Sequence, residues 1–150
     1  WGITLAHNGW VKTGVKYAAP MHLIGHVLSA RYDIPHGVAM SIIMPAWMKI
    51  ACASRTEKFA QFATRVFGAR SNDSGSAEMA ASTVALFEEH LRKSGVPVRL
   101  SMLPGLHWED EELLAIRDDV VRISFDETGL LPGNPKISSD ELYQLLRNAR

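Results

Sequence analysis

Cysteine is almost missing from this chain, because Cys52 is the only one among 150 residues. A single thiol cannot form a disulfide within the chain. Cys52 lies in an apolar stretch, so we expect it to be a small buried hydrophobic side chain. The lack of disulfides is typical of a reducing compartment, and the first residues do not have the pattern of a signal peptide. We therefore expect a cytoplasmic protein.

Net charge is missing too, since 16 basic and 16 acidic residues cancel. Nothing in this balance predicts an electrostatic surface for nucleic acid or for anionic lipid, so we expect neither as a partner. The most apolar stretch, residues 37–48, is twelve residues long and contains Pro45. A bilayer needs about 20 apolar residues, so this stretch predicts a buried helix and not a membrane span.

Alternating β-branched residues, which would indicate strands, are also absent. Apolar residues instead recur at helical spacing along the whole chain. A length of 150 residues, of which 47% are hydrophobic, fits one domain (residues 1–150) with a packed core. The prediction is an all-α bundle of six or seven helices. The expected helices cover residues 1–11, 21–32 and 38–53, followed by helices with apolar stripes at 59–67, 77–91, 113–123 and 142–149.

Polar residues mark several expected helix ends. Ser54–Glu57 and Ser138–Glu141 both have the form of a capping box, in which a serine and a glutamate satisfy backbone N–H groups at a helix start. The acidic run Glu109–Glu112 suits the positive end of a helix dipole, so we expect a solvated helix start there and not a cation site. The polar segment Gly68–Ser76 predicts a loop.

Three of the six histidines lie close together in the sequence, at positions 22, 26 and 36. His22 and His26 are four residues apart, which places them on one face of a helix. The segment Tyr32–Pro35 ends that helix and lets the chain fold back. A second helix starting near Gly37 would then bring His36 to the same pocket. Because imidazole is the commonest metal ligand and titrates near neutral pH, the pattern indicates metal-assisted chemistry.

The same residues are also compatible with ordinary packing. Histidine pairs at this spacing occur on many helices without a function. No glutamate follows His22, as the HExxH pattern of zinc proteases requires. On spacing alone, a metal or catalytic site and a structural role both remain open.

The stretch from Met21 to Met48 resembles the signature of the iron-containing alcohol dehydrogenase family, and more narrowly its butanol dehydrogenase and aldehyde reductase branch. The fourteen-residue spacing from His22 to His36 follows the family pattern, and Met44-Pro45 falls where the family has its proline. Two further segments are similar to family motifs. They are Leu5–Trp10, which resembles a helix just before the signature, and Thr128–Pro135, which resembles the closing Gly-Asn-Pro segment.

The resemblance implies part of a two-domain enzyme. Family members have an N-terminal domain that binds NADP or NAD and an all-helical C-terminal domain, and residues 1–150 look like the helical metal-binding domain alone, with the nucleotide-binding domain absent. The reaction implied is the interconversion of a small alcohol and an aldehyde, with Fe²⁺ or Zn²⁺, in a homo-oligomer.

The resemblance also assigns the histidines. His22 and His36 correspond to metal ligands, and His26 to a catalytic pocket histidine that contacts substrate or relays a proton. The family's other two ligands are an Asp and a His four residues apart, and no Asp stands four residues before any His here. We therefore expect a fragment that supplies part of the metal site and substrate pocket. Two alternatives remain: an inactive helical remnant that oligomerises or binds a partner, and a sister enzyme similar to glycerol dehydrogenase.

Overall fold

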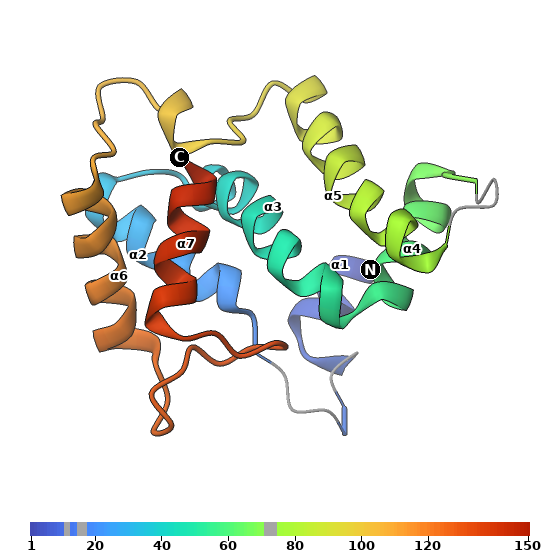
Figure 1. Ribbon diagram of the computed structural model, residues 1–150, viewed down its shortest axis with the longest axis horizontal. Coiled ribbons are helices and arrows are strands. Elements are labelled where there is room, and N and C mark those ends of the chain that lie inside the picture. The colour runs from blue at the N-terminus through green and yellow to red at the C-terminus, as the bar shows by residue number, and fades with distance from the viewer. Residues whose placement is uncertain (11–12, 15–17, 71–74) are drawn as a thin grey trace.

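The computed structural model describes residues 1–10, 13–14, 18–70 and 75–150. Within these residues it has seven α-helices and no strand, apart from one isolated bridge between Leu131 and Ile137. The predicted all-α class is therefore confirmed (Figure 1). The elements are α1 Gly2–His7, α2 Pro20–Tyr32, α3 His36–Ser54, α4 Thr56–Phe67, α5 Ser76–Lys93, the short 3-10 helix η2 Leu100–Met102, α6 Asp110–Ser124 and α7 Ser139–Ala149.

Helix α3 runs through the middle of the molecule. It contacts α2 and α7 on one side and α4 and α5 on the other, while α6 packs against α2 and α7 (Figure 1). Ten of its 19 residues are buried, so the predicted buried helix is confirmed. By length and composition alone α3 is apolar enough to cross a membrane, but half of the relevant window is buried inside the fold, as in the core helix of a soluble protein.

Two of the predicted helix starts have different outcomes. Ser138 caps α7 as expected, since its hydroxyl accepts from the Glu141 N–H and the Glu141 carboxylate accepts from the Ser138 N–H. The capping box at Ser54 is wrong. Ser54 is the last residue of α3 and its hydroxyl donates to the Ala51 carbonyl, so Arg55 alone separates α3 from α4.

Three further predictions need correction. Ile123 was expected on the buried stripe of α6, but it is 63% exposed, one residue before the helix ends. Cys52 is half-buried and not buried, with its thiol directed at the Lys49 carbonyl. The first helix ends at His7, shorter than the predicted 1–11, whose last residue lies outside the described residues.

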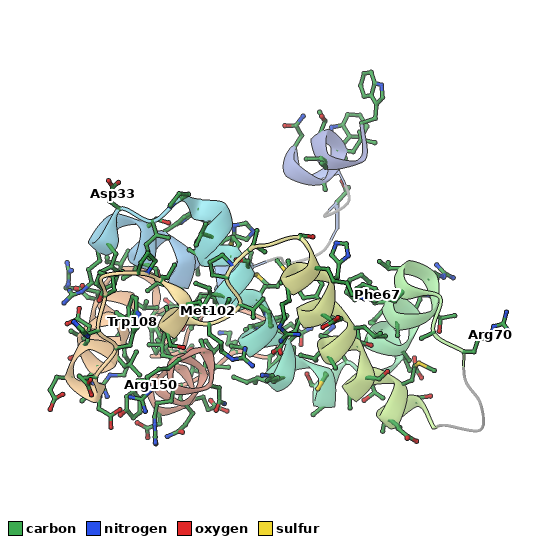
Figure 2. All side chains as sticks on the ribbon, turned by 90° about the horizontal axis from the view of Figure 1, so that it is seen from above. Asp33, Phe67, Arg70, Met102, Trp108 and Arg150 are labelled. Carbon is green, nitrogen blue, oxygen red and sulfur yellow. The ribbon has the colours of Figure 1, made fainter. Side chains whose placement is uncertain are left out.

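The predicted loop after α4 is present in its described part. Gly68 ends α4 in the left-handed region, with φ of 67°, and α5 begins at Ser76. Residues 71–74 of that prediction lie outside the described residues. Helix α1 stands apart from the body of the molecule (Figure 2). Ile3 on this helix and Trp1 just before it are exposed apolar side chains.

Candidate metal centre

The three clustered histidines lie where α2 turns into α3. His22 and His26 are exposed and one turn apart on α2, and His36 is the first residue of α3. Asp33, at the edge of the molecule in Figure 2, adopts a left-handed φ of 54° and ends α2. Pro35 then precedes the first turn of α3. At a helix start the fixed φ of proline and its missing backbone N–H do not destabilise the helix, because that N–H would have no partner within the helix. The predicted fold-back between the two helices is confirmed.

The structure brings the three imidazoles together. Nδ1 of His22 lies 3.0 Å from Nε2 of His36. The ring centroids are 5.1 Å apart for His22 and His36, 4.8 Å for His26 and His36, and 6.4 Å for His22 and His26. One ligand nitrogen from each residue lies within 4.8 Å of the other two. The convergence expected from the sequence spacing is therefore present.

His36 is less exposed than the other two histidines. Its ring lies over Gly25 of α2, where an added Cβ would be 3.5 Å from Cε1 of His36 and 3.5 Å from Sδ of Met40. Its Nδ1 is buried and has no hydrogen-bond partner among the described residues. The glycine thus leaves room for the ring at the helix surface, with Nε2 directed toward His22.

The donor set of this cluster suits a transition metal. Three imidazole nitrogens fit Zn²⁺, Fe²⁺, Ni²⁺ or Cu²⁺ better than the oxygen-seeking ions Mg²⁺ and Ca²⁺. Within the described ranges, the group of candidate ligands consists of the three histidines alone, without an Asp, Glu or Cys side chain. His36 also lies at the positive end of the α3 dipole, which favours a negatively charged group close by. The residues present therefore fit a divalent metal with open positions for other ligands.

Both ends of α2 are fixed by segments from far along the chain, which sequence reasoning missed. At its end, Arg31 pairs with Glu112 and Asp119 of α6, at 3.1 and 2.8 Å, and Tyr32 donates a hydrogen bond to Glu112. At its start, Pro20 lies against Gly133, where a Cβ would be only 2.9 Å from Cγ of Pro20. No local pattern signals contacts between residues about 80 to 110 positions apart.

The ionic cluster at the end of α2 changes the protonation of its members. Burial raises the pKa of the Tyr32 phenol to about 12, and the hydrogen bond to Glu112 contributes in the same direction. The hydrogen bond from Tyr32 lowers the pKa of the Glu112 carboxyl, and Arg31 adds to this effect. The acidic start of α6, predicted to be a solvated helix terminus, is therefore also an anchor for α2 through Glu112.

These observations define an all-helical domain with three converging imidazoles at the junction of two helices. The profile of the Fe-containing alcohol dehydrogenase family, C-terminal, matches residues 4–149, and the chain belongs to this family.

Several relatives are known by name. The chain is 32% identical over 116 residues to NADH-dependent butanol dehydrogenase A of Clostridium acetobutylicum, a match that covers 77% of this chain and 29% of that protein. It is 30% identical over 101 residues to NADPH-dependent aldehyde reductase YqhD of Escherichia coli, covering 67% of this chain and 26% of that protein.

A solved structure confirms the fold. The crystal structure of NADH-dependent butanol dehydrogenase A from Thermotoga maritima superposes with a TM-score of 0.83 and 29% identity, covering 99% of this chain and 37% of that one. The chain thus spans about a third of the length of the relatives that it matches.

Proposed function

We propose that this chain is part of a metal-dependent oxidoreductase that interconverts alcohols and aldehydes with a nicotinamide cofactor. It would supply part of the metal site and part of the substrate pocket. The observation that carries the proposal is the approach of His22 to His36 in a chain of this family. The relatives support the reaction class, because their names give alcohol or aldehyde substrates and NADH or NADPH.

In this proposal His22 and His36 bind the metal. His22 offers Nδ1 and His36 offers Nε2, the two nitrogens that face each other. A bound Fe²⁺ or Zn²⁺ supplies Lewis-acid chemistry, which polarises an aldehyde carbonyl or lowers the pKa of an alcohol hydroxyl. His36 is half-buried and its ring packs over Gly25, which holds one ligand in place while His22 adjusts from the exposed face of α2.

His26 has the catalytic role in this proposal. It is exposed, and its ring centroid lies 4.8 Å from that of His36, so it can contact a substrate beside the metal. A histidine in this position can hold or pass on the proton that an alcohol loses. We further propose that NADP or NAD binds mainly outside residues 1–150, and that the protein is cytoplasmic.

Metal content and activity test this proposal together. His22→Ala and His36→Ala are expected to abolish metal binding and aldehyde-dependent oxidation of NADPH or NADH in the enzyme that contains this domain. His26→Ala is expected to lower turnover while leaving the metal in place. His90→Ala, at an exposed position on α5, is the matched control. Full metal occupancy in either ligand variant would contradict the assignment.

A second candidate function is that of a helical module that associates with itself without catalysis. One observation favours it: Trp1, Ile3 and Trp10 are 97%, 87% and 73% exposed. Other residues form an open, mostly apolar hollow of about 320 Å³, whose wall consists of aromatic and methionine side chains, Trp47 and Phe59 among them, together with Arg55 and Lys58. Exposed apolar area of this kind favours association. Sedimentation equilibrium tests this function. An apparent molecular mass that rises with protein concentration in the wild type, and that is lower in Ile3→Ser at the same concentration, supports self-association through α1.

A further inference from the structure

We infer that the hollow between α3 and α4 binds an amphipathic anion of the medium-chain carboxylate class. The apolar tail of this ligand lies in the hollow, and its charged head contacts Arg55 and Lys58, two residues of the hollow's wall. The inference goes beyond the proposed function and depends neither on a metal nor on the reaction. Along α3 the wall begins at Met44, eight residues after His36, which is about 12 Å of helix length. Of the lining residues, Met21 alone is next to one of the three histidines in the sequence.

The hollow has the size and the wall of a small-ligand pocket. Helix α4 follows α3 after Arg55 alone but packs mainly against α5, so space is left between α3 and α4. This space measures about 320 Å³, within the range of about 300–1,000 Å³ that is typical of ligand pockets, whose walls are mostly apolar and aromatic. Methionine side chains are flexible, so they adapt to an alkyl chain. The apolar residues of the wall are Met21, Met44, Trp47, Met48, Phe59 and Phe62.

The charged residues of this wall are both cations. Arg55 and Lys58 are exposed, and neither pairs with a carboxylate among the residues that the structure describes. The same two side chains also line an adjoining hollow of about 370 Å³, which is more polar and includes Glu57 and Asn134. Two cations and one carboxylate leave one positive charge in excess. The cations therefore stand where an apolar space meets a polar one.

This combination selects the class of ligand. An uncharged apolar molecule would fill the hollow but leave both cations without a partner, and a cationic one would be repelled by them. A single alkyl chain that ends in a carboxylate satisfies both parts of the site. Its tail removes apolar surface from water, and its two oxygens accept charge-assisted hydrogen bonds from the guanidinium of Arg55 and from the ammonium of Lys58.

Calorimetric titration of the 150-residue chain with hexanoate, octanoate and decanoate tests the inference. The buffer contains EDTA, so that no carboxylate binds through a metal at the histidines, and little salt, because salt screens exposed ion pairs. We expect one site per chain, and each methylene that enters the hollow should tighten binding by up to about fourfold. Decyltrimethylammonium, which has a tail of similar length and the opposite charge, should bind more weakly than decanoate. The inference is overturned if decanoate shows no saturable binding below the concentration at which it self-associates, or if the cationic probe binds equally well.

Matched variants test the head and the tail of the site separately. Replacing both Arg55 and Lys58 by Gln should weaken decanoate binding by about fivefold or more, whereas Arg65→Gln, on the exposed part of α4 outside the hollow, should not change it. Met44→Gln keeps the length of the side chain but makes it polar, so it should also weaken binding several-fold. Met102→Gln, at an exposed position elsewhere, is its control. Wild-type affinity in the double variant or in Met44→Gln would overturn the inference.

Methyl NMR of the six methionines in the wild-type chain locates the ligand without any substitution. Decanoate should shift the methyl signals of Met44 and Met48 in the hollow and leave those of Met79 and Met102 in place. A response confined to Met40, which lies beside His36, would place the carboxylate at the histidines and overturn the inference.

The same signals distinguish the carboxylate from a second copy of the chain in the hollow. If the hollow methyl groups respond to protein concentration and not to decanoate, the hollow is an interface between copies and the inference is overturned. None of these measurements involves metal content or turnover, so the proposed oxidoreductase function stands or falls separately.

Discussion

Nδ1 of His22 lies 3.0 Å from Nε2 of His36, although one belongs to the first turns of α2 and the other begins α3. No covalent bond joins the two side chains, so the distance between them is set by the packing of the two helices. It depends on how α2 is oriented against α3, and α2 is held at both ends by the C-terminal half of the chain. The first two predictions concern these two anchors.

Gly133→Ala is expected to destabilise the fold. The added Cβ would lie 2.7 Å from the Pro135 carbonyl oxygen and 2.9 Å from Cγ of Pro20, both closer than real contacts allow. Forced overpacking of this kind costs about 1–3 kcal/mol. Gly37→Ala is the matched control, because nothing lies within 4 Å of its Cβ position and alanine is the better helix former. Urea unfolding of both variants measures the difference, and equal midpoints would refute the steric argument.

Glu112→Gln is expected to reduce stability at neutral pH and to flatten its dependence on acid. The pKa of Glu112 is lower in the folded protein than its ordinary value of 4.5, so the carboxylate stabilises the fold above that pH, and this contribution is lost as pH falls below it. The side chain is about a third exposed, so the loss at pH 7 is about 0.5–1 kcal/mol. The free energy of unfolding, measured at pH 7 and at pH 3, should be lower in the variant than in the wild type at pH 7. At pH 3 the two values should be nearly equal. Glu89→Gln, in a pair on the surface of α5, is the control.

The phenol of Tyr32 is expected to lose its proton at a higher pH than an ordinary tyrosine does. Its pKa of about 12 in the folded protein lies above the ordinary 10, so its stabilising effect is complete below pH 10 and disappears as pH rises toward 12. The difference in phenolate absorbance between the wild-type chain and Tyr32→Phe isolates this group. A component in that difference that titrates near pH 10 would show that the phenol is not buried against Glu112.

Ser138→Ala and Ser54→Ala should differ although the two sequences have the same capping pattern. The Ser138 hydroxyl caps α7 by accepting a hydrogen bond from the Glu141 N–H, so its loss should cost about 1 kcal/mol. Ser54 lies at the end of α3, and its hydroxyl donates a hydrogen bond to the Ala51 carbonyl of the same helix. Its loss should therefore lower the free energy of unfolding by about 0.3 kcal/mol at most. Thermal unfolding of the pair measures this, and a larger effect at Ser54 would contradict the cap assignment.

Helices and the histidine junction are predictable because their signals are local. The spacing of His22 and His26 and the proline before His36 act over a few residues, and so does the capping box at Ser138. The exposed position of Ile123 was not predictable, because periodicity does not say where a helix leaves the core.

The anchors of α2 were not predictable for a related reason. Arg31 and Glu112 are 81 residues apart, and neither has a distinctive local sequence. Charged residues of this kind are usually solvated, so only the packing of α2 on α6 makes them partners. The Ser54 motif fails for a different reason: the capping pattern is present in the sequence, but Ser54 is still the last residue of α3, and Arg55 is the N-cap of α4.

The long separation between α2 and its anchors has a consequence for synthesis of the protein. During synthesis the three histidines emerge within fifteen residues of one another, whereas Glu112 emerges 81 residues after Arg31, and Gly133 follows later still. Until those residues emerge, nothing fixes both ends of the helix that carries His22 and His26. Metal loading is therefore expected only after Gly133 has been synthesised and has packed against Pro20.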